Sequence, residues 1–243
     1  MVFLKESFIW ILAIIISFVG TIGSFIGINI LQEALFTTDE YIMWVMNGNI
    51  SFFIPVYVLT FMWGSFYLLD KVFHRKRNDT IPMSRMKRSY FSRFRKLLIS
   101  IFILGNIVIL YTFVISITVI NKENMVVHSF LQPLGKEYRY QDITEIYTGI
   151  HGKGNNFSYS EGDFYYFIKM NDGKKIDLAI MGGTSIIDDD TDEGHPFFII
   201  EKLDQRFVAM KIHKDASMKN ISLLKNHYDP IYIEKVQNIM KNN

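Results

Sequence analysis

The sequence predicts an α-helical membrane domain with three transmembrane helices, followed by an α+β domain. The first observation behind this prediction is a set of three runs without Asp, Glu, Lys or Arg, at residues 7–32, 41–69 and 97–121. Each run exceeds the ~20 residues that a helix needs to cross a bilayer. The second is a mean hydropathy of +0.16, which is high for a soluble domain. The third is strand and helix patterning after residue 121. Together they exclude a plain soluble protein and a disordered chain, and the absence of cysteine excludes a disulfide scaffold.

These runs predict two domains. Domain 1–120 holds transmembrane spans at about 8–31, 44–69 and 97–118, with a basic cytoplasmic loop at 70–96. Domain 121–243 is rich in strands and ends in helices. The first run is far longer than the apolar region of a signal peptide, and no small-residue cleavage site closes it. We therefore predict that this first span is retained.

The basic loop predicts the orientation of the chain. Residues 70–96 carry ten Lys or Arg and two Asp, and basic loops between membrane spans favour the cytoplasm over a nucleic-acid patch. Counting crossings then gives a multi-pass protein of the cell membrane with an extracytoplasmic C-terminal domain. A re-entrant run would keep that domain inside. Alternating bases and aromatic residues before the third span also suit contact with anionic lipid. The residues that carry these predictions are Arg75, Lys76, Arg77, Arg85, Lys87, Arg88, Arg93, Arg95 and Lys96.

A seam of small residues predicts that the first span packs against protein. Its members recur at spacings of 4, 3, 4 and 3, so they share one helix face. In lipid, small side chains let two helix backbones approach closely. We favour packing against the other two spans over a homo- or hetero-oligomer face. The seam consists of Ala13, Ser17, Gly20, Ser24 and Gly27.

The membrane runs contain no charged residue that would mark a transport path. Asn106 lies inside the third run, where a lone Asn is typical of a hydrogen bond between helices. An ion-coupled carrier is therefore disfavoured.

The C-terminal domain shows a hairpin and two helices. Residues 164–170 and 176–180 flank an Asp-Gly pair, which predicts a tight β-turn. A first helix starts near Pro196, with its apolar face separate from a polar face that includes Asp204. Pro230 starts a second helix.

An acidic stretch before the first helix is the one candidate metal site. Asp188, Asp190 and Asp192 match the first three oxygen positions of a calcium loop. The glycine and the bidentate glutamate of such a loop are missing, because Glu193 and Ile199 occupy those positions. A solvated acidic turn is the favoured reading, with calcium as the alternative.

Signatures of catalysis are absent. The chain has no H-E-x-x-H, no G-x-S-x-G and no cysteine nucleophile. The sequence therefore predicts neither catalytic residues, an enzymatic activity nor a cofactor.

The start of the C-terminal domain resembles bacterial PH-like (pleckstrin-homology-like) domains attached to membrane helices. The resemblance spans residues 117–181 and the helix at 197–210, and it rests on three pieces of sequence. These are Thr118-Val119-Ile120-Asn121, Asn124-Met125-Val126-Val127, and Gly135 with Tyr138-x-Tyr140-x-Asp142-Ile143-x-x-Ile146. It implies an antiparallel sheet or barrel closed by C-terminal helices, although six strands are counted where seven are expected. It also implies binding or scaffolding, and similar proteins hold this domain in the cytoplasm.

Two functions follow. The favoured one is a non-enzymatic membrane protein whose PH-like module binds a protein or lipid partner, in envelope homeostasis or in immunity to a membrane-active peptide. The alternative is an accessory subunit of a membrane transport or secretion complex. The predicted partners are the lipid bilayer and one further protein or lipid, with no nucleic acid.

Overall fold

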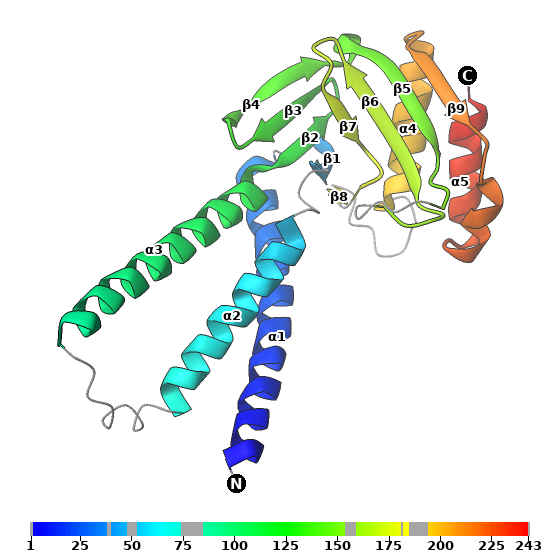
Figure 1. Cartoon of the computed structure of the whole chain (residues 1–243). Coiled ribbons are helices and arrows are strands. Elements are labelled where there is room, and N and C mark those ends of the chain that lie inside the picture. Colours follow the sequence, from blue (N-terminus) through cyan, green and yellow to red (C-terminus); the bar gives the residue numbers. More distant parts are fainter. Residues whose placement is uncertain are drawn as a thin grey trace. The chain divides into compact units, whose positions relative to one another are not determined.

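A computed structural model describes residues 2–37, 40–47, 53–73, 85–153, 159–180, 182–184 and 194–242. The chain forms two compact units. Unit 1 comprises Met1–Leu31 and Phe53–Val114, and unit 2 comprises Gln32–Phe52 and Ile115–Asn243. Unit 2 is therefore assembled from two separate pieces of sequence. Figure 1 shows helices in the first unit and sheets with covering helices in the second.

Unit 1 consists of the helices α1 (Val2–Phe36, up to Leu31), α2 (Phe53–Phe73) and α3 (Arg85–Ile115, up to Val114). Helix α2 runs antiparallel to α1. The Trp10 ring stacks on Phe66 at a centroid distance of 4.0 Å, and Phe25 meets Tyr57 at 6.2 Å. The start of α2 therefore lies beside the second half of α1, and the end of α2 beside its first half.

Helix α3 returns along α2 in the opposite direction. Phe113 meets Tyr57 at 5.9 Å, and Phe102 meets Trp63 at 4.8 Å. Between these contacts, the Thr60 hydroxyl donates to Asn106 Oδ1 at 2.9 Å. This bond confirms the prediction that Asn106 serves as a link between helices.

The prediction of three transmembrane helices is wrong. Among the described residues, one helical segment is long and apolar enough to cross a membrane, Trp10–Phe36, with a mean hydropathy of 2.4. The apolar segments of α2 and α3 are Pro55–Leu69 and Ile99–Ile115, which are shorter than the ~20 residues required. The second and third charge-free runs are long because each also contains a buried strand, and such strands are as free of charge as a membrane helix.

Unit 2 contains two sheets. The first has the strand order β4-β3-β2-β1-β8 and the second the order β7-β6-β5-β9. The short helices η2 (Tyr140–Asp142) and η4 (Ile221–Asn226) lie in connections. The strands are β1 (Tyr41–Met46), β2 (Ile117–Asn121), β3 (Asn124–Ser129), β4 (Gln132–Arg139), β5 (Ile143–Ile150), β6 (Phe164–Met170), β7 (Lys175–Asp177), β8 (Gly182–Thr184) and β9 (His213–Ser217).

Strand β1 lies inside the first sheet although it precedes α2 in the sequence. It pairs antiparallel with β2, from Tyr41 opposite Asn121 to Met46 opposite Ile117, and it pairs with β8 on its other side. Met43 and Val45 are 1% and 0% exposed. The piece of chain between α1 and α2 is thus part of the core of unit 2.

The second sheet confirms one predicted turn and departs from the predicted barrel. Strands β6 and β7 form the expected hairpin, with Gly173 at a φ of +84° that favours glycine. The final strand, β9, pairs parallel with β5 after a helical crossover. The barrel prediction is wrong: in the described residues the two sheets share no paired strand and stay open.

Two helices complete unit 2, α4 (Pro196–Ala209) and α5 (Pro230–Lys241), each beginning at the predicted proline. In Figure 1 they lie side by side next to the second sheet. One hydrophobic core joins both sheets with these helices, from Val45 in β1 to Phe207 in α4 and Val236 in α5. Unit 2 therefore folds around a single core.

Candidate functional site

A pocket at the start of α5 is the candidate ligand site of unit 2. Its volume is about 350 Å³. It is lined by His195, Tyr232 and the stretch 225–229, which joins η4 to α5. Polar groups dominate the lining, so the pocket suits a small polar ligand or a polar side chain of a partner.

The start of α4 positions one wall of this pocket. The Phe197 backbone N–H donates to Nδ1 of His195 at 3.3 Å, which makes this histidine the N-cap of α4. Because Nδ1 accepts this bond, the proton of the neutral ring lies on Nε2. The ring also stacks on Tyr232 at 4.0 Å. His195 is therefore held on two sides, by α4 and by α5.

His227, which also lines the pocket, packs closely against a glycine. Gly162 adopts a φ of +95°, and a Cβ atom added there would lie 2.4 Å from Cδ2 of His227. Glycine is thus required both for the backbone conformation and for the close approach of the imidazole ring. Beside it, burial raises the pKa of Tyr228, and the charge of Asp163 raises it further. The phenol of Tyr228 stays protonated at neutral pH and can donate a hydrogen bond.

The structure does not assign the predicted calcium ligands to this pocket. Asp188, Asp190 and Asp192 lie outside the described residues. The residues that flank this acidic stretch are tied together, because the Thr184 hydroxyl donates to the Gly194 carbonyl oxygen at 2.8 Å. In the described part of the chain, no three His, Asp or Glu side chains are placed to hold a metal ion.

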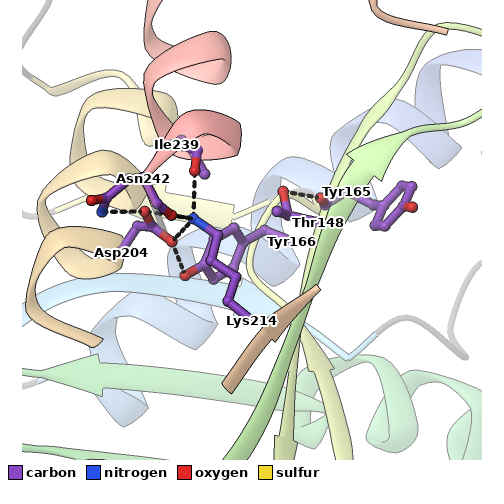
Figure 2. A network of polar contacts seen from close by, with 7 residues as sticks. All are labelled: Thr148, Tyr165, Tyr166, Asp204, Lys214, Ile239 and Asn242. Carbon is purple, nitrogen blue, oxygen red and sulfur yellow. Dashed lines mark hydrogen bonds and ion pairs between the residues drawn. The ribbon is translucent and has the colours of Figure 1, made fainter. Parts of the chain in front are cut away.

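A buried ion pair between α4 and β9 is the strongest polar feature of unit 2 (Figure 2). Lys214 Nζ lies 2.7 Å from Asp204 Oδ1, and the two side chains are 3% and 1% exposed. Burial lowers the pKa of Lys214, while the hydrogen bond to Asp204 opposes that shift. Burial also raises the pKa of Tyr166, whose hydroxyl donates to Asp204 at 2.7 Å.

This ion pair also binds the C-terminal residues. Lys214 Nζ donates to the backbone oxygens of Asn242, at 2.7 Å, and of Ile239. The Asn242 side chain donates to Asp204 at 2.8 Å. All three donors of the lysine and both oxygens of the aspartate are occupied, so the cluster fixes α5 to the second sheet. None of its members lines the pocket.

The sequence analysis placed Asp204 on the polar face of its helix, and that placement is wrong, since the residue is 0% exposed. The spacing of Asp204 from the apolar residues of its helix could have shown that it is buried. Asp204 lies four residues after Ile200 and three before Phe207, which puts it on the buried stripe. A charge on such a stripe predicts a buried partner, but the sequence does not say that the partner is Lys214 on β9.

A second buried carboxylate lies in β7. Asp177 is 6% exposed and accepts hydrogen bonds from the backbone of Tyr166 and Ala179, at 3.2 and 3.0 Å, and from the Tyr159 hydroxyl at 3.1 Å. Burial raises its pKa, and these hydrogen bonds reduce the shift. His151 stacks on Tyr159 at 4.3 Å, and burial lowers the pKa of this imidazole. The group is enclosed and is a structural cluster.

Residues 130–134, which we call the β3–β4 turn, comprise the connection between β3 and β4 and the first residues of β4, and they present apolar side chains to the surface. Leu131 and Leu134 are 86% and 94% exposed, and Phe130 is 46% exposed. Gly135 follows with a φ of +83°, where a Cβ atom would clash with Val126. The sequence analysis did not single out this turn.

The small-residue seam of α1 is only partly at the helix contact. Ala13 and Ser17 are 0% and 4% exposed, and a Cβ atom on Gly20 would lie 2.5 Å from the Phe61 ring of α2. Ser24 is half-buried and donates to the Gly20 carbonyl oxygen. Gly27 is exposed, with nothing within 4 Å of an added Cβ.

The predicted topology residues divide into two groups. Residues 75–77, which are Arg75, Lys76 and Arg77, lie outside the described part of the chain. The others occupy the first half of α3, namely Arg85, Lys87, Arg88, Arg93, Arg95 and Lys96.

Comparison with family models, curated proteins and solved structures finds no match. The resemblance to PH-like domains therefore stays a prediction. The structure defines the class of protein by its architecture alone. An apolar N-terminal helix, compatible with a membrane anchor or a signal sequence, is combined with an α+β unit of two sheets.

Proposed function

We propose that this protein is a membrane-anchored, non-enzymatic binding module. The observation that carries the proposal is the surface of α1. Its segment Trp10–Phe36 has a mean hydropathy of 2.4, and only 17% of its most apolar window is buried. Ile14, Phe18 and Val19 are each more than half exposed. A surface of this kind is costly in water and is stable in lipid.

Helices α2 and α3 also carry exposed apolar side chains. Leu59 and Leu68 on α2 and Ile101 and Leu104 on α3 are more than half exposed. The hydrogen bond between Thr60 and Asn106 satisfies polar groups that hydrocarbon would leave unpaired.

We place unit 2 on the extracytoplasmic side. Helix α2 ends beside the first half of α1, where Phe66 stacks on Trp10, and the basic residues at 70–96, which follow α2, favour the cytoplasm at that end. The second half of α1, from which the chain enters unit 2, would then face outward.

The partner would be a protein or a lipid head group that uses the pocket of His195 and Tyr232. Support comes from the mixed polar lining and from the rigid placement of His195 between two helices. The resemblance to PH-like domains favours binding or scaffolding in the same way.

Membrane anchoring and orientation are tested together. The protein should stay in the membrane pellet after alkaline carbonate and leave it in detergent. Since the chain has no cysteine, Gln141→Cys in unit 2 and Ser84→Cys in the basic segment each introduce one thiol. On intact cells, a membrane-impermeant maleimide should label the first variant and not the second. Release by carbonate would refute the anchor, and labelling of Ser84→Cys alone would reverse the orientation.

Binding is tested by placing a photo-crosslinking amino acid at Tyr232, with the exposed Gln141 as the control position. We expect one defined adduct at Tyr232 and none at Gln141. The same adducts at both positions, or none at Tyr232, would contradict the pocket as the binding site. A stoichiometric partner crosslinked through unit 1 instead would support the accessory-subunit alternative.

A further inference from the structure

We infer that the β3–β4 turn is a second membrane contact, inserting its leucines into the bilayer interface beside the end of α1. This inference rests on the proposed membrane anchoring by α1. It adds a lipid-binding surface on unit 2, separate from the pocket, with the interfacial region of the bilayer as its partner.

The exposed apolar residues of the turn form a patch. Isolated surface leucines are ordinary in soluble proteins. Here the five residues Phe130-Leu131-Gln132-Pro133-Leu134 include two leucines that are 86% and 94% exposed. An apolar tip of this kind is typical of a surface that binds a partner or a membrane.

The distribution of apolar exposure in unit 2 points to one end. Among its described residues, the large hydrophobic side chains that are more than half exposed are Leu35, Leu131 and Leu134. Leu35 belongs to the last turn of α1, at the end of the apolar segment Trp10–Phe36. Two of the three are therefore in the turn, and the third is in the candidate membrane helix itself.

Direct contacts join the turn to the end of that helix. The Phe36 and His128 rings lie 4.5 Å apart. Nδ1 of His128 donates to the carbonyl oxygen of Pro133, inside the apolar stretch, at 2.9 Å. One histidine thus links the last residue of α1 to the turn. If α1 lies in lipid, the turn therefore lies close to the surface of the membrane.

The other connections to the helices reach the same end of the first sheet. The Asn47 side chain, just after β1, donates to the His128 carbonyl oxygen at 2.8 Å. The Asn47 backbone N–H donates at 3.1 Å to Ser116, the residue between α3 and β2. Asn47 thus connects Ser116 to His128, the histidine that also contacts Phe36 and Pro133.

The length of α1 also agrees with insertion of the turn at the bilayer interface. The apolar segment of α1 has 27 residues, or roughly 40 Å at the usual helical rise, against a hydrocarbon core of roughly 30 Å. Its end at Phe36 then lies in the interfacial region. The side chains of Leu131, in the connection, and Leu134, near the start of β4, can bury there while the rest of this edge strand stays outside the hydrocarbon.

The neighbouring lysine, Lys136, does not explain the proposed contact as an attraction to anionic lipid. Lys136 pairs with Asp172 at 2.7 Å. We therefore expect the contact to depend on apolar burial and to be insensitive to the charge of the lipid.

Fluorescence quenching of the full chain in lipid vesicles tests the inference. Leu131→Cys and Leu134→Cys place a probe on the turn, and Gln141→Cys places one just beyond the other end of β4, whose last residue is roughly 17 Å from Leu134 at the usual strand rise. Ile22→Cys, near the middle of α1 and 45% exposed, reports on the anchor itself. The four positions are exposed, and the emission of the buried Trp44, with Trp10 and Trp63 replaced by Phe, checks that unit 2 stays folded.

We expect a nitroxide carried at shallow depth on the lipid to quench most of the emission at both leucine positions, in phosphatidylcholine and in phosphatidylglycerol vesicles alike. Aqueous iodide should quench the probe at Gln141 and not those at the leucines. Three outcomes would overturn the inference. If the leucine probes respond to iodide as Gln141 does while Ile22 is quenched from the lipid, the turn is in water and the anchor stands. If the leucine probes are shielded from both quenchers, protein covers the turn. If the Ile22 probe responds to iodide, the anchor fails, and this inference fails with it.

Discussion

Helix α1 and strand β1 are neighbours in the sequence and share a composition, yet they occupy opposite environments. In α1, Ile14 and Phe18 are 54% and 68% exposed. In β1, Met43 and Val45 are 1% and 0% exposed, in the middle of a five-stranded sheet. The absence of charge in residues 7–32 and 41–46 is compatible with both situations, since a strand covered on both faces and a lipid-exposed helix exclude charge for the same reason. Length distinguishes them: α1 has 35 residues and β1 has six.

The most severe test introduces a charge into each region. Val45→Asp buries an unpaired carboxylate in the core and should cost unit 2 at least about 4 kcal/mol of stability. Val19→Asp, on an exposed position of α1, should leave unit 2 folded and cost about 2.5–3.5 kcal/mol of membrane insertion. Trp44 emission, with Trp10 and Trp63 replaced by Phe, reports on unit 2, and the membrane fraction reports on α1. Unchanged membrane retention of Val19→Asp would show that α1 does not lie in lipid.

The second test concerns the charges that unit 2 does bury. Lys214→Met leaves Asp204 without its cation, which should cost unit 2 about 3–5 kcal/mol. The double variant Lys214→Met with Asp204→Leu should recover most of this loss, because the remaining groups no longer face an unpaired charge. Urea unfolding followed by Trp44 emission measures both. If the double variant is as unstable as the single one, the ion pair itself, and not the desolvated carboxylate, carries the stability.

A third test distinguishes the two sides of α1. Gly20→Leu would press on the Phe61 ring of α2 and should destabilise the packing of unit 1 by about 1–3 kcal/mol. Gly27→Leu meets open space and should cause no loss. The thermal midpoint of helical circular dichroism in detergent compares the two. A loss in Gly27→Leu would mean that another chain covers this face, as the homo-oligomer alternative predicts.

The smallest expected effect is a change of pH dependence in unit 2. Because burial raises the pKa of Asp177 above its usual 3.8, the folded state holds this proton more tightly than the unfolded chain does. The resulting stability is present below the unfolded pKa and is lost as the pH rises through the folded one. Asp177→Asn removes this titration while keeping an acceptor for Tyr166 and Ala179, so stability at pH 7 should change by no more than about 1 kcal/mol.

Unfolding free energies of both proteins between pH 3 and pH 7 measure this effect, and the difference should shift in favour of the variant as the pH rises. A constant difference would show that Asp177 titrates at its ordinary pKa.

Local signals predicted the local elements well. Pro196 and Pro230 mark the starts of α4 and α5, and the Asp-Gly pair marks the β6–β7 turn. The polar link at Asn106 was also predicted, because an amide in an apolar helix needs a partner. The pocket was not, because His195 and Tyr232 are 37 residues apart and become neighbours only when α4 and α5 pack together.

The sequence alone determined that α1 is an apolar helix long enough to cross a bilayer, and that a strand-rich unit follows it. Both properties depend on residues close together in the chain, where length and periodicity can be read directly. Tertiary structure decided that residues 41–46 belong to the core of unit 2, that Asp204 is buried against Lys214, and that His128 lies against Phe36 at the end of α1. Each of these outcomes joins segments remote in sequence, and an apolar or charged residue carries no record of which distant segment will cover it.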